Sequence, residues 1–207
     1  MHLKRQETPR LLPIPRKGTK YVARALTHHR DSVPVVVAVR DMLKLTKTLK
    51  EVKQMIKAKL LKINGKEVKD HRESIKLFSI FKADKTYELS ISPTHRFVLA
   101  ETKDKKERLC KVIGKKVLKN SKTQINLHDG SNVLTKDKIN ISDSVYLDFS
   151  GKIKKSISLE KGKDVFIISG KYAGLKGKIV SLEDKKLAKI KLKEKDIELP
   201  IVHIIVQ

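Results

Sequence analysis

The sequence predicts an α+β fold that is multidomain and β-rich, and three features of its 207 residues lead to this prediction. Alternating runs of apolar and polar residues recur from about Lys76 to the C terminus, with short turn sequences between them. Apolar residues recur at helical spacing between Asp31 and Ile56, whereas the first residues are rich in proline and basic side chains. The predicted segments are a basic extended arm (1–30), a module of helices with a hairpin (31–75), a central antiparallel β domain (76–157) and a C-terminal SH3-like barrel (158–207).

Basic residues dominate the composition: 48 Lys and Arg stand against 23 Asp and Glu, so the formal net charge is +25. Self-repulsion of this size disfavours the compact free protein unless a polyanion relieves it, which favours a phosphate-bearing partner. No apolar run approaches the about 18 residues of a membrane span, and no secretion signal follows Met1, so we expect an intracellular protein without a membrane partner. Cys110 is the single cysteine, which excludes an internal disulfide and a thiolate zinc cluster and leaves it as an expected core residue.

The arm carries seven basic residues, one acid and three prolines between Met1 and Arg24. Proline fixes φ and removes a hydrogen-bond donor, and the apolar residues are too few and unpatterned for a core. We therefore expect this segment to be disordered in the free protein. Solvated tails seldom concentrate charge of one sign, so we interpret it as a binding arm. Its candidate contacts with nucleic acid are Lys4, Arg5, Arg16, Lys17 and Lys20.

The stretch DSVPVVVAVRDMLKL predicts a first helix after the arm. Asp31 or Ser32 is the expected N-cap, and Pro34 lies near the first helical position, where proline is favoured. The valines prefer strands, so propensity and spacing disagree. The caps and the helical spacing of the apolar residues favour the helix.

Thr48 and Glu51 have the spacing of a capping box and predict the start of a second helix. Its apolar stripe is expected to contain Leu45, Leu49, Val52 and Ile56. A row of lysines beside such a stripe is most often the solvated side of an amphipathic helix. However, the segment from Arg40 to Lys69 holds ten basic residues and three acids, and Asn64-Gly65 after the helix is a strong hairpin signal. The candidate contacts here are Arg40, Lys44, Lys50, Lys53, Lys57 and Lys59.

Three hairpins are predicted in the central β domain. TYELSI and RFVLAE alternate around Ser92-Pro93, TQINL and SNVL flank Asp129-Gly130, and SVYLDF and KIKKSISL flank Ser150-Gly151. Regularly spaced hairpins predict an antiparallel barrel or curled sheet.

The C-terminal segment contains the glycine-rich stretch VFIISGKYAGLKGKIV. Its glycines fit the spacing of neither a phosphate-binding P-loop nor a dinucleotide fingerprint. Gly170, Gly174 and Gly177 instead suit a loop between two alternating strands, in which the glycines serve the turn. Three further short strands follow and complete the predicted SH3-like barrel. The candidate contacts in this loop are Lys171, Tyr172 and Lys176.

No enzyme signature is found in the sequence. The seven histidines include no H-E-x-x-H spacing, and no serine lies in a G-x-S-x-G elbow. Asp129 beside His128 is explained as a turn residue by the glycine that follows it. We therefore expect no catalytic residue, metal, cofactor or small-molecule substrate.

Several stretches resemble known families. EKGKDVFIISGKYAGLKGKIV resembles a KOW motif, and VVVAVRDMLKLTKTLKEVKQMIKAKLLKINGKEV resembles the RNA-binding module named after ribosomal protein S-four. With HLKR, PIPRKGTKYVAR and INLHDGSN in this order, nearly the whole chain resembles the archaeal and eukaryotic (e-type) family of small-subunit ribosomal protein S-four. Two departures are Tyr21, where members often carry tryptophan, and HRESIKLF, which lacks an expected Pro and Gly.

The resemblance implies a non-enzymatic constituent of the small ribosomal subunit in the cytoplasm. Its partners would be small-subunit rRNA and neighbouring ribosomal proteins, and binding would rest on phosphate neutralisation and recognition of RNA shape. The alternative is a dissociable KOW-containing ribosome-associated or transcription factor.

Overall fold

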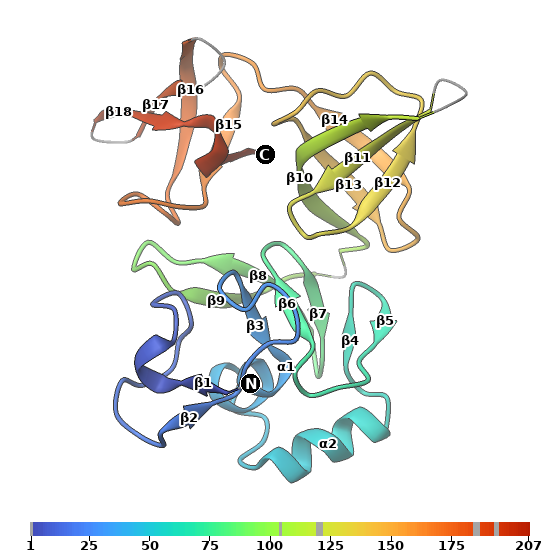
Figure 1. The fold of residues 1–207 in the computed structure, drawn as a ribbon, viewed down its shortest axis with the longest axis vertical. Coiled ribbons are helices and arrows are strands. Elements are labelled where there is room, and N and C mark those ends of the chain that lie inside the picture. The colour runs from blue at the N-terminus through green and yellow to red at the C-terminus, as the bar shows by residue number, and fades with distance from the viewer. Residues whose placement is uncertain (1, 104, 119–121, 184–186, 193–194) are drawn as a thin grey trace. The chain divides into compact units, whose positions relative to one another are not determined.

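The computed structural model describes residues 2–103, 105–118, 122–183, 187–192 and 195–207. The chain forms two compact units, Met1–Lys105 and Lys106–Gln207, each of which is described by itself (Figure 1). Strands predominate in both, so the predicted β-rich character with few helices is confirmed. Within the described residues, no helix combines the length and the apolar character that a bilayer span requires.

The first unit contains two strand pairs, β1-β2 and β3-β6, and a five-stranded sheet of order β5-β4-β7-β8-β9. Its elements are β1 (Leu3–Lys4), the 3₁₀ turn η1 (Arg5–Glu7), β2 (Tyr21–Val22), β3 (Ser32–Pro34), α1 (Val35–Val37), the π-helical η2 (Ala38–Met42), α2 (Leu49–Lys57), β4 (Lys62–Ile63), β5 (Lys66–Glu67), β6 (Ser74–Lys76), β7 (Ile80–Lys82), β8 (Thr86–Ile91) and β9 (Phe97–Glu101).

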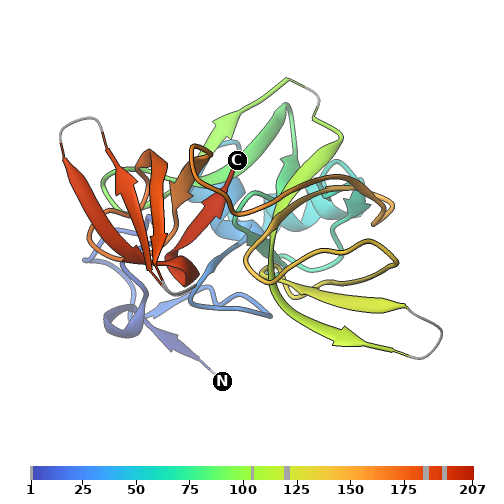
Figure 2. The same cartoon turned by 90° about the horizontal axis from the view of Figure 1, so that it is seen from above.

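The second unit contains two five-stranded antiparallel sheets, of order β12-β11-β10-β13-β14 and β18-β17-β16-β15-β19, which Figure 2 shows side by side. Its elements are β10 (Glu107–Val117), β11 (Thr123–Leu127), β12 (Asn132–Thr135), β13 (Ser144–Asp148), β14 (Ile153–Ile157), β15 (Asp164–Ile167), β16 (Lys176–Glu183), β17 (Leu187–Lys191), β18 (Asp196–Pro200), the 3₁₀ turn η3 (Ile201–His203) and β19 (Ile204–Val206).

The N-terminal arm is folded, in contrast to the expected disorder. Strands β1 and β2 pair antiparallel, with Leu3 opposite Val22. The apolar side chain of Leu12 is buried, and the backbone N–H of Phe97 in β9 donates to the carbonyl of Leu11 at 2.8 Å. The few apolar residues of the arm thus pack against the rest of the unit. This contact is long-range in sequence, so the local pattern of the arm does not predict it.

The predicted first helix is present, but its predicted cap is wrong. Pro34 is the N-cap of α1, and no side chain caps the helix there. Asp31 is exposed, and Ser32 lies in β3, where its hydroxyl donates to upstream carbonyls. Val33 in the same strand lies opposite Ile75 of β6. Strand propensity and helical spacing therefore each describe part of this valine-rich stretch, which changes from strand to helix at Pro34.

The Asn64-Gly65 hairpin is confirmed. Both residues have positive φ, +49° and +79°, which a type I′ turn requires, and they join β4 to β5. Strand β4 also pairs with β7, where Ile63 lies opposite Phe81. The predicted boundary between residues 75 and 76 therefore does not coincide with a structural boundary, because the strands up to β9 belong to the sheet of the first unit.

The hairpins and strands predicted further along the chain are also present. Turns around Ser92-Pro93, Asp129-Gly130 and Ser150-Gly151 join β8 to β9, β11 to β12 and β13 to β14. Cys110 is buried in the core of the β10–β14 sheet, as expected, with Ile125 and Leu147. Five strands follow, as predicted, and enclose a separate apolar cluster under the β15–β19 sheet.

Candidate nucleic-acid interface

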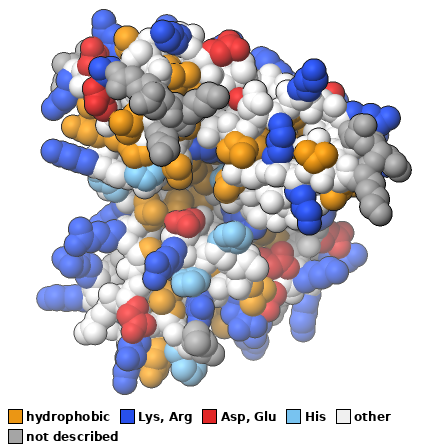
Figure 3. Space-filling model, turned by 45° about the horizontal axis from the view of Figure 1, so that its top comes forward, with side chains coloured by type: hydrophobic (Ala, Val, Ile, Leu, Met, Phe, Trp, Pro, Cys, Tyr) orange, Lys and Arg blue, Asp and Glu red, His pale blue; other side chains and the backbone are white. Residues whose placement is uncertain are grey.

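Lysine and arginine side chains stand out from the face shown in Figure 3, with fewer aspartates and glutamates between them. The net charge of +25 is therefore presented to solvent to a large extent. The candidate contacts come from three places, the arm, the helical segment and the C-terminal loop. The structure separates those with free charged groups from those engaged within the fold.

Arg5 is engaged within the arm. Its Nε donates to the carbonyl of Thr19 at 2.7 Å, and its Nη2 donates to the Thr19 hydroxyl at 3.1 Å. Because these bonds hold the two ends of the arm together, we assign Arg5 a structural role in addition to any contact it makes. The exposed candidates of the arm are Lys4, Arg16, Lys17 and Lys20.

The capping box of α2 is confirmed. The Thr48 hydroxyl accepts the N–H of Glu51 at 3.4 Å, and the Glu51 carboxylate accepts the N–H of Lys47 at 2.9 Å. The Lys47 N–H, together with the Thr48 hydroxyl, lowers the pKa of Glu51. Val52 is fully buried, which fixes the rotation of the helix, although Leu49 is partly exposed. Side chains three and four residues apart share one helix face, and the exposed lysines of this face are Lys50, Lys53 and Lys57.

Two candidates of the helical segment are already paired with carboxylates. Arg40 donates from Nε and Nη2 to both carboxylate oxygens of Asp41, at 2.9 and 2.8 Å, and this hydrogen bonding raises the pKa of Arg40. Lys59 lies 3.2 Å from the carboxylate of Glu67. Lys44 is exposed and has a positive φ of +56°. A phosphate would have to displace a carboxylate at Arg40, whereas Lys44 presents its charge to solvent.

The glycines of the C-terminal loop have two distinct functions. Gly170 and Gly174 have φ of +89° and +88°, which side-chain-bearing residues rarely adopt. Gly177 is in β16, where an added Cβ would lie 2.5 Å from the side chain of Ile190. Tyr172 packs against the apolar cluster under the sheet, so part of its ring is structural. The two exposed candidates here are Lys171 in the loop and Lys176, the first residue of β16.

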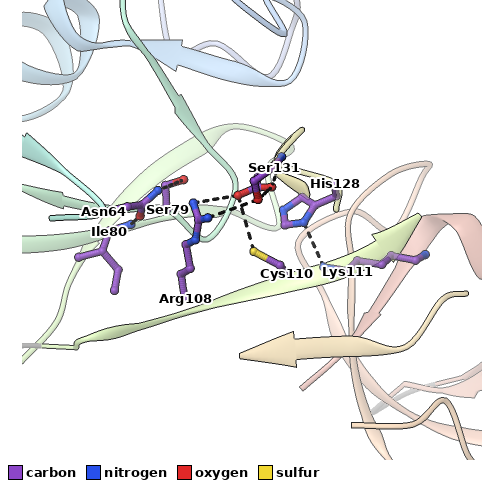
Figure 4. Close-up of polar contacts among 9 residues, drawn as sticks. Asn64, Ser79, Ile80, Arg108, Cys110, Lys111, His128 and Ser131 are labelled. Carbon is purple, nitrogen blue, oxygen red and sulfur yellow. Dashed lines mark hydrogen bonds and ion pairs between the residues drawn. The ribbon is translucent and has the colours of Figure 1, made fainter. Parts of the chain in front are cut away.

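A buried polar network surrounds Asp129. Arg108 Nη1 lies 2.8 Å from its carboxylate, the N–H of Ser131 donates to it at 2.8 Å, and the Cys110 thiol donates to it at 3.8 Å. Figure 4 shows Arg108, Cys110 and Ser131 close together. Burial raises the pKa of Asp129, but the Ser131 hydroxyl and the Arg108 charge outweigh it, so the pKa lies below its ordinary value. His128 accepts a hydrogen bond from the backbone N–H of Lys111. These bonds fix the turn at Gly130, which supports Asp129 as a turn residue.

Lys111 has a structural role that the sequence did not predict. Its buried ammonium donates to the carbonyls of Ile201, Val202 and Ile204 at 2.6, 3.0 and 2.7 Å, which links β10 to η3 and β19. Burial lowers the pKa of Lys111 to about 8. The acceptors lie at least 90 residues away, so no local sequence signal marks this contact.

The exposed basic residues suit phosphate binding. The described residues contain no group of three or more His, Cys, Asp and Glu side chains that could hold a metal ion. Cys110 is 1% exposed and donates to the Asp129 carboxylate, so it is not accessible to a substrate. Lysines on a folded surface provide mobile positive charges, which neutralise phosphates without reading bases.

Comparison with known proteins gives matches along nearly the whole chain. The family described as "Ribosomal family S4e" matches residues 83–153, and the KOW motif matches residues 161–193. Small ribosomal subunit protein eS4 of Methanocella arvoryzae is 32% identical over 189 residues, which cover 88% of this chain and 81% of the relative. The eS4 protein of Archaeoglobus fulgidus is 31% identical over 187 residues, covering 87% of this chain and 80% of the relative.

A solved structure has a similar fold. The crystal structure of 30S ribosomal protein S4e from Thermoplasma acidophilum matches with a TM-score of 0.75 and covers 85% of this chain and 94% of that chain. The sequence identity is 22%, so this likeness concerns the fold.

Proposed function

The chain belongs to the family of small ribosomal subunit protein eS4, and from this premise we propose that it is a structural constituent of the small ribosomal subunit that binds rRNA. The observation that carries the proposal is the similarity to eS4 proteins over 88% of the chain. The resemblance predicted from the order of the sequence motifs is thereby confirmed. The net charge of +25 supports the same conclusion, since assembly with a polyanion relieves the self-repulsion of the free protein.

The mechanism is neutralisation of phosphates together with recognition of RNA shape. Each phosphate contact releases condensed counterions, so the affinity falls steeply as salt rises. Aromatic residues make up 4% of the chain and tryptophan is absent, which makes base stacking on single strands a secondary contribution. The contacts come from the exposed basic residues of the three sites, which are Lys4, Arg16, Lys17, Lys20, Lys44, Lys50, Lys53, Lys57, Lys171 and Lys176.

The proposal assigns these contacts to separate modules. The segment from α1 to β5 serves as the helical RNA-binding module, and residues 158–207 as an SH3-like KOW barrel. The spacing of Lys50, Lys53 and Lys57 on α2 supports the first assignment, and the match of the KOW motif to residues 161–193 supports the second. The protein acts at the cytoplasmic ribosome beside other ribosomal proteins, without enzymatic activity, cofactor, membrane partner or small-molecule substrate.

Salt dependence tests the mechanism. With about 6 to 10 phosphate contacts, the affinity for folded small-subunit rRNA should fall roughly a thousandfold or more between about 50 and 200 mM salt. A flat dependence, or equal affinity for an unstructured RNA of the same length at the highest salt, would contradict the proposal. The alternative, a dissociable KOW factor, is tested by washing ribosomes at high salt: a structural protein stays at about one copy per small subunit, and a factor is released.

A further inference from the structure

The arm and the turn between β8 and β9 enclose a groove in the first unit, with a volume of about 810 Å³. One side is formed by the arm from η1 onward, and the other by the residues that precede β9. Its lining combines basic side chains, proline and aliphatic residues, and small polar residues, and contains no carboxylate. The lining residues are Arg5, Gln6, Thr8, Pro9, Arg10, Leu12, Ile14, Pro15, Arg16, Thr94, His95 and Arg96.

The two sides of this groove are held in place by the fold. The hydrogen bonds of Arg5 to Thr19 close the arm on itself, and the N–H of Phe97 donates to the carbonyl of Leu11. Leu12 is 6% exposed, so the arm is anchored by apolar burial as well. Figure 1 shows the arm beside β9. A groove held in this way needs little ordering when a ligand enters it, which favours binding.

Three arginines of the lining, Arg10, Arg16 and Arg96, are exposed. Within the described parts of the chain, none of them forms an ion pair, whereas Arg40 and Arg108 are each paired with an aspartate. Leaving a cluster of arginines without counter-charge costs free energy through mutual repulsion, and this cost is removed when an anion binds among them.

We propose that this groove binds the sugar-phosphate backbone of an RNA strand, an inference that rests on the proposed rRNA binding. Guanidinium groups match phosphate with two parallel N–H···O bonds, a geometry that the lysine ammonium cannot form. The aliphatic side of the groove, with Ile14 and Pro15, offers an apolar surface for riboses. The groove lining holds no Phe, Tyr or Trp, and His95 is its single aromatic ring against four arginines, so the backbone is the part of RNA that it fits best.

The groove brings together residues that lie far apart in sequence. Arg96 follows the β8–β9 turn, 80 residues or more from the arginines of the arm, and His95 beside it adopts a positive φ of +58°. Neither Arg10 nor Arg96 was a candidate in the sequence analysis. An RNA strand in the groove would touch the arm and β9 together, so that the arm binds as part of the folded unit.

Equilibrium binding to the protein's own small-subunit rRNA, transcribed and refolded, tests the inference with the full chain. The groove variant is Arg10→Gln/Arg16→Gln/Arg96→Gln. The control removes three exposed lysines of the other unit, Lys152→Gln/Lys154→Gln/Lys155→Gln, and so has the same net charge. We expect the groove variant to lose at least about tenfold in affinity at 0.1 M salt and about two to three units of the salt slope, with a smaller loss in the control. A third variant, with lysine at the three arginine positions, should recover part of the affinity, because charge returns without the fork geometry.

Equal affinities of the groove variant and the control would overturn the groove inference and leave rRNA binding intact. Failure of the unmodified chain to bind folded rRNA would instead overturn the proposed function. Modification of arginines by phenylglyoxal, read by mass spectrometry, gives a second readout on the unmodified chain. RNA should slow the modification of Arg10, Arg16 and Arg96. Unchanged modification in the presence of bound RNA would show that the groove does not take RNA. Equal protection by polyglutamate would show that it takes any polyanion and has no fit to the sugar-phosphate backbone.

Discussion

Replacing Asp129 by asparagine is expected to destabilise the second unit by about 3 to 5 kcal/mol, because it leaves the largely buried Arg108 guanidinium without a counter-charge. The magnitude follows from burial. The side chains of Asp129 and Arg108 are 4% and 16% exposed, and their charged atoms lie 2.8 Å apart. A solvent-exposed pair of the same geometry would contribute only about 0 to 1 kcal/mol. Asparagine keeps the Oδ1 acceptor for the N–H of Ser131. The substitution therefore removes the negative charge and leaves this hydrogen bond of the turn in place.

Urea unfolding of the full chain at pH 7, followed by circular dichroism, measures this loss. The matched control is Asp137→Asn, an exposed aspartate that also bonds to a neighbouring hydroxyl, and its cost should stay below about 1 kcal/mol. For a unit of about 100 residues, the loss at Asp129 corresponds to a fall in Tm of roughly 10 °C or more.

The contribution of the Asp129 charge to stability should also depend on pH. The folded-state pKa of Asp129 is lowered from its ordinary value of 3.8, so the stability that its charge contributes is fully present above that value. It is lost as the pH falls through the lower, folded-state pKa, because the unfolded state then binds more protons. The difference between the unmodified chain and Asp129→Asn should therefore narrow on acidification. A cost below 1 kcal/mol at pH 7, or a difference that does not narrow, would refute the reasoning.

Three further predictions concern Lys111, Gly177 and the lysine row of α2. Burial lowers the pKa of Lys111 to about 8 from 10.5, so the free energy of unfolding should rise by up to about 3 kcal/mol between pH 8 and 10.5. The Lys111→Met variant should not show this rise. Parallel pH profiles of the two proteins would contradict the prediction. Gly177→Ala should lower the free energy of unfolding by about 1 to 3 kcal/mol, because the added Cβ would lie 2.5 Å from the side chain of Ile190. Gly114→Ala should lower it less, because its Cβ would lie 3.5 Å from the nearest side chain. Equal losses in thermal unfolding would contradict the close packing at Gly177. Replacing the exposed Lys50, Lys53 and Lys57 by glutamate should abolish incorporation into small subunits and leave the circular dichroism unchanged. The same replacement of Lys152, Lys154 and Lys155 should not abolish incorporation. Normal incorporation of the first variant would exclude the α2 site.

The features that could be predicted from the sequence are those whose physical cause lies within a few residues. Thr48 caps α2 through a bond to Glu51, three residues on. Asn64 and Gly65 form their turn from their own backbone preferences. The position of the hairpin in the fold has a different origin, since β4 pairs with β7 across a long connection. The predicted boundary between residues 75 and 76 lies inside this sheet for the same reason. Alternation of apolar and polar residues predicts a strand but does not predict which strand pairs with it.

The same distinction governs the candidate interface. Basic residues can be counted in the sequence, but whether a charge is free depends on the partners that folding supplies. Arg5 and Lys111 bond to carbonyls 14 and 90 residues away, so their cations serve the fold. Arg96 is far from the arm in sequence and lines the same groove as Arg10. A charge used internally contributes little to counterion release, because no phosphate replaces its partner without cost. The proposed phosphate-binding surface therefore consists of the exposed cations that the fold leaves without a carboxylate or carbonyl partner. It keeps most of the candidates in the basic runs, loses Arg5, Arg40 and Lys59 to internal partners, and gains Arg96 from outside those runs.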